Sequence, residues 1–269
     1  IIQGDRLEPF YEDIAGQWGT IWLKAGSKEH FINHTLLKNN IIGIIVDSIG
    51  SNSDPTLEIR NTEIYNTSNF GLLGRAANIV GSNLVIGNNG QSSLACTYGG
   101  TYNFTHATFA NYWSGGIREF PALLVNNFQS SAAVGNSGEL LVNDLLAANF
   151  TNCIIEGNQS AEFRLQQNDQ AGFNFKFKNN LLRFFNSGGG SADDPLYDFD
   201  DMDKYQDNIF NGEPDFKDVQ TNKFFIGDAS EAKASADLTA AGQVPFDLLG
   251  VNRVTSPDIG AYQHMIFEE

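Results

Sequence analysis

The sequence predicts an all-β solenoid, in which short strands stack as successive turns of one chain, closed at the C-terminus by an acidic tail. Two observations predict the stack: an eight-residue apolar pattern recurs along the chain, and a second short apolar strand follows most of its copies. A third predicts the tail, because most of the excess negative charge follows a glycine-rich stretch near residue 188. Internal repeats of this length are the signature of stacked repeat folds.

The first element has the pattern apolar-x-(Asn, His or Gly)-x-x-apolar-x-x. Its copies begin 20 to 27 residues apart, except for one gap of 46 residues. The copies are Ile32–Asn39, Ile59–Asn66, Ile79–Ile86, Phe104–Asn111, Phe150–Gly157 and Phe177–Phe184. Since 46 residues are close to two periods, we expect Leu123–Phe128 to form a degenerate turn inside the gap.

The second element is a short apolar strand some twelve to fifteen residues after the start of a copy. It is present as Gly43–Val46, Gly71–Leu73, Ser93–Cys96 and Ala161–Leu165. None of these segments has the 3.6-residue spacing of an amphipathic helix, which excludes repeats built from paired helices. One turn alone cannot offset the conformational entropy of ordering it, roughly 1–2 kcal/mol per residue. The turns must therefore stack and bury one another's apolar side chains.

The polar position of the pattern forms a column along the predicted stack. His34 and His106 share this column with Asn61, Asn152 and Asn179, and Gly81 fills it in the third copy. Asn and Gly accept the left-handed backbone of a sharp bend, and a stacked Asn can bond its neighbour in the next turn. We therefore interpret His34 and His106 as turn residues rather than general bases, and assign no role to His30 or His264.

Charge divides the chain near Ser187–Ser191. Residues 1–188 hold 15 acidic and 11 basic side chains, whereas residues 189–269 hold 17 and 5. We predict β-helix coils over 1–188, continuing upstream of Ile1, and an acidic capping segment over 189–269 that packs on them. The net charge of −16 disfavours nucleic acid, anionic membranes and acidic polysaccharides.

Two further features bound the function. Cys96 and Cys153 lack metal-site or disulfide-framework spacing and are interpreted as small apolar fillers. The chain has no apolar run of 18 residues, so we expect no transmembrane segment.

The repeat resembles the right-handed parallel β-helix proteins of the pectate-lyase-like class over residues 20–188. A more specific likeness lies in Asp247–Arg253 and Pro257–Tyr262, which resemble the D-x-x-G-x-x-R and P-D-I-G-A-Y-E ending of secreted bacterial members, with Gln263 in place of the final Glu. Gly16–Ile21 resembles their coil opening. The resemblance implies a right-handed parallel β-helix and an exported protein: periplasmic, outer-membrane-anchored as a lipoprotein, or extracellular. It supplies no reaction.

Aromatic residues offer one candidate binding surface. Tyr98, Tyr102, Tyr112 and Trp113 crowd one turn and its connection. Aromatic faces stack on sugar rings, so an exposed cluster would bind a glycan; alternatively, the rings cover the edge of the turn.

Arg75 is a second candidate, because Asp47 occupies the equivalent place one turn earlier. Such a pair is what a lyase site would need, although most surface pairs are ordinary ion pairs. No cluster of basic residues with several Asp, which a polyuronate lyase requires, is present in the repeat.

No cofactor is expected. Asp198–Asp203 could hold Ca²⁺, but the spacing differs from the twelve-residue calcium loop, and a solvated acidic loop is the preferred interpretation. Ser/His/Asp triads, phosphate-binding loops and zinc spacings are absent.

The favoured hypothesis is an exported, monomeric β-helix protein that binds a polysaccharide or another cell-surface component. The alternative is a polysaccharide lyase or glycoside hydrolase on a neutral or weakly acidic glycan. The sequence identifies no catalytic residue and leaves the choice open.

Overall fold

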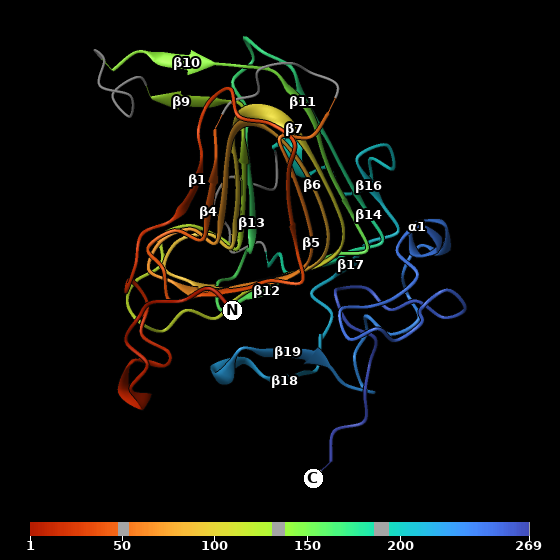
Figure 1. Cartoon of the computed structure of the whole chain (residues 1–269). Helices are drawn as coiled ribbons and strands as arrows, with labels where there is room; N and C mark the ends of the chain where they lie inside the picture. Colours follow the sequence, from red (N-terminus) through yellow and green to blue (C-terminus); the bar gives the residue numbers. More distant parts are fainter. Residues whose placement is uncertain (48–53, 131–137, 186–193, 269) are drawn as a thin grey trace.

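The computed structural model describes residues 1–47, 54–130, 138–185 and 194–268 (Figure 1). It is an all-β structure, in which 15 strands of these residues join one sheet with parallel pairing throughout. The predicted all-β class and parallel pairing are thus confirmed. The arrangement is consistent with a β-helix-like solenoid.

The strands pair in three stacks, which we call A, B and C. Stack A contains β1 (Ile21–Leu23), β4 (Ile44–Val46), the first residues of β6 (Leu72–Asn89) and β7 (Leu94–Asn111), β8 (Leu123–Asn126) and β13 (Phe163–Gln166). Stack B contains β2 (His30–Asn33), the first half of β5 (Leu57–Thr67), the middle of β6 and β7, β11 (Leu145–Thr151), β14 (Phe173–Lys178) and β16 (Tyr205–Gln206). Stack C contains β3 (Leu36–Lys38), the ends of β5, β6 and β7, β12 (Ile154–Gly157), β15 (Leu181–Leu182) and β17 (Ile209–Phe210). The chain passes through A, B and C in this order in each turn.

The core lies between the stacks and is built from columns of like side chains. In stack B, Phe104, Phe150, Phe177 and Tyr205 follow one another in register. Their rings lie nearly parallel, with centroid separations of 5.8, 5.0 and 5.6 Å. Each turn thus buries the aromatic face of the next, as the stacking argument requires.

The bend from stack B to stack C uses the predicted polar column. Its residues all have left-handed backbones, with φ between 47° and 57°. They are His34, Asn61, Asn83, His106, Asn152, Asn179 and Asp207. The turn role predicted for His34 and His106 is confirmed.

In the structure, the third copy of the pattern starts two residues later than the sequence predicts. Gly81 pairs with Ile59 and Phe104 in stack B, and the bend residue of this turn is Asn83. A Cβ atom at Gly81 would lie 2.5 Å from Cδ1 of Phe104. The glycine is therefore needed to make room for the Phe104 ring, not to form the bend.

The prediction of a degenerate turn in the 46-residue gap is also wrong. Thr151 of β11 pairs directly with Thr105 of β7, so no turn separates them. β8 is instead the stack A strand of this same turn. The turn is enlarged by the connection at residues 112–121 and by an antiparallel hairpin of β9 (Phe128–Ser130) and β10 (Leu140–Val142), which projects from the stacks in Figure 1.

The C-terminal residues pack along the side of stack C (Figure 1). They form the antiparallel pair β18 (Phe216–Asp218) and β19 (Lys223–Ile226), and the short helix α1 (Leu238–Gln243). Phe224 and Tyr262 pack on Val85 and Ala110 of stack C. The boundary predicted at residues 187–191 lies outside the described residues; β16 and β17, which follow it, pair with β14 and β15. The division into two units stays a prediction.

The ending motif fastens this segment to the bend column. Arg253, which is fully buried, donates to Oδ1 of Asn83 at 3.0 Å and to the carbonyl of Ala261 at 3.1 Å. The Asp258 carboxylate accepts hydrogen bonds from the backbone amides of Ala234 and His264. The motif therefore acts structurally, by attaching the C-terminal segment to the stacked turns.

Candidate functional site

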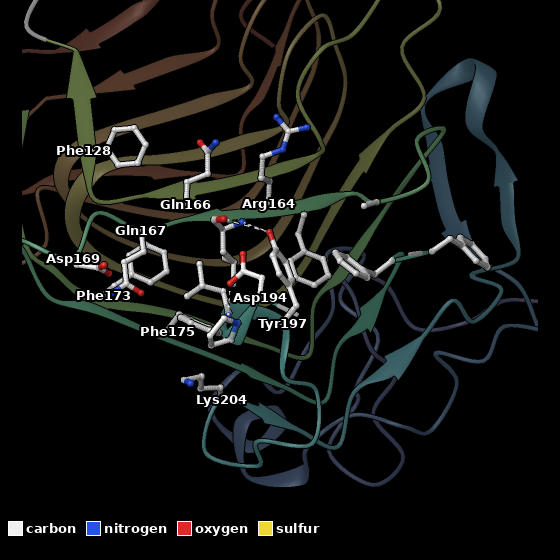
Figure 2. Close-up of a pocket in the computed structure, with 17 residues that line it drawn as sticks. Phe128, Arg164, Gln166, Gln167, Asp169, Phe173, Phe175, Asp194, Tyr197 and Lys204 are labelled. Atoms are coloured by element: carbon white, nitrogen blue, oxygen red, sulfur yellow. Dashed lines mark hydrogen bonds between the residues drawn. The ribbon is translucent and has the colours of Figure 1, made fainter. Parts of the chain in front are cut away.

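A cavity of about 980 Å³ lies beside β13, where stack A ends within the described residues (Figure 2). Stacks B and C each continue for one more strand, β16 and β17. Within the described ranges, β13 is the last strand of stack A, and the cavity lies beside it.

Tyr197 bonds the edge of β13 that does not pair with β8. Its hydroxyl accepts a hydrogen bond from the amide of Leu165 at 2.8 Å and donates one to the carbonyl of Leu165 at 3.3 Å, as drawn in Figure 2. Tyr197 belongs to the 3-10 helix η3 (Pro195–Tyr197), capped by the carboxylate of Asp194, which accepts from the amide of Leu196. A side chain therefore satisfies the sheet edge, and the space beside it stays open.

The lining combines apolar rings with polar side chains of balanced charge. The aromatic members are Phe128, Phe163, Phe173, Phe175, Phe184, Phe185 and Tyr197. The polar members are Arg164, Gln166, Gln167, Asp169, Asp194 and Lys204. Two basic and two acidic side chains face one cavity, and Lys204 pairs with Asp201 outside it at 2.9 Å. Such a lining suits an uncharged ligand with apolar faces and many hydroxyl groups.

The predicted aromatic surface is not one surface. Tyr102 is fully buried in stack B; its hydroxyl donates to the carbonyl of Gly99 at 3.0 Å and accepts from the amide of Ala77. It cannot contact a ligand, so its assignment as a binding residue is wrong. The alternation of inward and outward side chains along β7 places Tyr102 inward.

The three other aromatic residues are divided between two corners. Tyr98 lies at the bend before stack B, where its carbonyl accepts a hydrogen bond from Asn143. Tyr112 and Trp113 follow stack C and line a separate cavity together.

Arg75 and Asp47 do lie on neighbouring turns. Nε of Arg75 is 2.6 Å from Oδ1 of Asp47, and Oδ2 of Asp47 accepts from the indole of Trp22. Both carboxylate oxygens of Asp47 are therefore engaged, which favours an ordinary ion pair over a lyase site.

The contacts of Asp198–Asp203 and of His106 can be compared with the roles considered for them from the sequence. In Asp198–Asp203, Asp198 and Asp201 accept hydrogen bonds from the amides of Asp200 and Asp203. Across the described residues, no group of three or more His, Cys, Asp and Glu side chains is placed to hold a metal ion. His106 is buried beside the carbonyl of Gly260 and the amide of Asn152, and burial lowers its pKa well below the usual range.

Glu156 is a buried carboxyl that sequence reasoning missed. It lies on β12 beneath the C-terminal segment, 3.6 Å from Nη1 of Arg183, and accepts from the amide of Gly157. Burial raises its pKa to about 7, with Glu162 and Glu213 adding to the effect and Arg183 opposing it. Its register partner is Ala110, and a single Glu in this place gives no sequence signal of its burial.

The raised pKa predicts a pH-dependent stability. The folded protein holds the Glu156 proton up to about pH 7, whereas the unfolded chain releases it near the ordinary glutamate pKa of 4.5. This carboxyl therefore reduces the free energy of unfolding as pH rises from 4.5 to 7, by roughly 2–3 kcal/mol. Glu156→Gln should gain that stability at pH 8 and almost none at pH 4.5. Urea unfolding of both proteins at the two pH values measures it; an equal gain at both would contradict the burial.

The pocket beside β13 was also missed. Phe163 and Leu165 are predicted to form a strand, which they do, but no residue pattern indicates what lies beside that strand. One signal in the sequence is the glycine-rich stretch at residues 187–191, where the repeated pattern ends; these residues lie outside the described ranges.

None of the helices in the described ranges is long and apolar enough to cross a membrane. Comparison with protein-family models, with curated proteins and with solved structures found no match to this chain.

Proposed function

We propose that this chain is a right-handed parallel β-helix of the pectate-lyase-like class that binds a neutral glycan in the pocket beside β13. The right-handed coil is supported by the strong preference of parallel strand connections for that hand, together with the repeated order of stacks A, B and C. The ligand is supported by the pocket's lining.

The observation that carries the proposal is the meeting of aromatic rings and amide side chains in one open cavity. Rings of Phe128, Phe173 and Tyr197 offer apolar faces for the C–H face of a sugar. Gln166 and Gln167 each bring a donor and an acceptor, which match sugar hydroxyls. The net charge of −16 disfavours a polyanionic glycan.

The test is calorimetric titration with neutral oligosaccharides of glucose, xylose, mannose and galactose, and with oligogalacturonate. We expect one or more neutral sugars to bind, and Gln166→Ala and Phe128→Ala each to weaken binding about fivefold or more, the effect of one lost hydrogen bond or ring contact. Gln129→Ala is the matched control, because Gln129 neighbours Phe128 on β9 but does not line the pocket. Binding of oligogalacturonate alone, or binding that all three variants leave unchanged, would overturn the proposal.

A glycoside hydrolase is the second candidate, supported by the two carboxylates that line the same pocket, Asp169 and Asp194. A pair of carboxyl groups flanking the sugar is what such hydrolysis requires. Release of reducing ends from the same sugars, abolished in Asp169→Asn, would favour the enzyme over the binding protein. Lyase activity would instead produce unsaturated ends and require Arg75, so Arg75→Ala separates the two reactions.

We also propose that the protein is exported, as the resemblance of its ending motif implies, and that it is monomeric. Fractionation of cells that express the natural gene tests the location, and sedimentation equilibrium tests the monomer. Recovery in the cytoplasm or a stable dimer would remove these two points without affecting the pocket.

A further inference from the structure

A second cavity of about 480 Å³ lies at the corner that follows the strands of stack C. Its lining residues are separate in sequence from those of the β13 pocket. Three parts of the chain form it: an N-terminal segment, the corners that follow stack C, and the C-terminal segment. Its lining residues are Asp13, Ile14, Ala15, Asn66, Ser68, Asn88, Tyr112, Trp113, Ser114, Gly115, Gln220 and Asn222. Among the residues described, none lines both cavities.

Asparagine side chains hold these three parts together. Asn88 accepts a hydrogen bond from the amide of Tyr112 and donates to the Asn222 side chain and to the carbonyl of Val219. Asn66 donates to the carbonyl and carboxylate of Asp13. The walls are thus connected by hydrogen bonds before any ligand binds, which lowers the entropy lost on binding.

Trp113 is fixed at the mouth of the cavity. Its amide donates to Asn111 at 3.3 Å, and its carbonyl accepts from Asn158 at 3.1 Å. Gly115 packs against the indole, where a Cβ atom would lie 2.6 Å from Cζ2. The ring is only half-buried, so part of it remains available to a ligand.

Tyr112 has a different role from Trp113 in the wall of the cavity. Its ring stacks on Phe224 and meets Phe216 edge-on, with centroids 6.3 and 6.2 Å apart. The C-terminal segment therefore covers one face of Tyr112. Of the two predicted aromatic residues, Trp113 is the one placed to stack on a ligand.

The polar lining selects an uncharged partner. It contains amides and hydroxyls from Ser68, Ser114, Gln220 and Asn222, and no basic side chain. The one carboxylate, Asp13, lies within 3.9 Å of Lys38 as well as bonding Asn66. Hydroxyl and amide groups around one half-buried indole match the hydroxyls and the apolar face of a sugar ring.

We infer that this cavity is a second saccharide site, which takes a neutral sugar ring stacked on Trp113. The site shares a ligand class with the β13 pocket but none of its residues, so either can fail without the other. If both bind, a polymer that reaches both sites binds more tightly than an oligomer that reaches one.

Tryptophan emission can report on this site alone. The chain has three tryptophans, and the β13 pocket is lined by none. In the double variant Trp18→Phe/Trp22→Phe, Trp113 is the single reporter. We expect a saturable change in its emission with at least one of the neutral oligosaccharides named above, and the same change when Gln166→Ala is added.

In this background, Ser68→Ala and Gln220→Ala each remove one polar group from the wall of the cavity and leave Trp113 in place. We expect each to weaken the emission titration about fivefold, the effect of one hydrogen bond. Gln129→Ala is the control and should change nothing. The inference is overturned if no neutral sugar alters the emission, or if Ser68→Ala and Gln220→Ala leave the affinity unchanged. It is also overturned if the cation tetramethylammonium alters the emission whereas the sugars do not. Sugar binding by calorimetry without any emission change would leave the β13 proposal standing and remove this one.

Discussion

Arg118→Met is expected to lower the free energy of unfolding by about 3–5 kcal/mol, because it leaves the buried carboxylate of Glu162 without its cation. Both side chains are almost wholly buried, and two hydrogen bonds join the guanidinium to the two carboxylate oxygens. Arg118 also donates to the carbonyls of Asn111 and Phe120. Glu162 in turn accepts from the amide of Ala122 at 2.7 Å. The pair therefore ties the connection at residues 112–121 to stack A.

Guanidinium chloride unfolding of wild type and Arg118→Met measures this loss. Lys233→Met is the control, since Lys233 forms an exposed ion pair with Asp228 and should contribute less than about 1 kcal/mol. Equal losses of unfolding free energy in the two variants would contradict the burial of the Arg118–Glu162 pair.

Arg253→Met is the second large effect, and it should act on the C-terminal segment first. The guanidinium donates to Asn83 and to the carbonyls of Gly260 and Ala261. Burial lowers the pKa of Arg253 to about 10, while Asp247 and Asp258 oppose this, so the side chain is charged at neutral pH. Methionine leaves Oδ1 of Asn83 without its donor and removes the cation that faces the two carboxylates, a loss of about 3–5 kcal/mol.

Because residues 216–268 contribute no strand to the three stacks, the segment should detach before the stacks unfold. Hydrogen exchange with mass spectrometry should show faster exchange over residues 216–268 in Arg253→Met and little change in β6 and β7. Arg60→Met removes an exposed arginine that pairs with Glu58 and serves as the control. Uniformly faster exchange across the stacks would contradict a local role for Arg253.

The repeat made much of the fold predictable, because the stacking of turns places like residues in columns. Asn at the bend carries a local conformational requirement, so His34, Asn61 and Asn152 were assigned to it from sequence. Gly81 was misplaced because glycine satisfies two demands equally well in a sequence: a left-handed bend and space for a neighbour's ring. Only the position of Phe104 in the next turn distinguishes them.

The sites were less predictable, because they depend on what lies beside a turn. Tyr102 and Trp113 are both aromatic and eleven positions apart, yet one faces the core and the other a cavity. The β13 pocket depends on how Tyr197 lies against the edge of β13, and the Trp113 cavity depends on the C-terminal segment that lies over stack C. The residues that line a cavity do not by themselves predict either arrangement.

Both cavities, and every column used to place their residues, depend on turns that stack in register. Disulfide formation tests this directly. Ser82 and Thr105 are register partners on neighbouring turns of stack B, and Thr151 lies one turn further. Rungs about 4.8 Å apart are within disulfide reach, and two rungs are not. The register predicts that Ser82→Cys/Thr105→Cys cross-links readily and Ser82→Cys/Thr151→Cys does not. Preferential cross-linking of the second pair would contradict it.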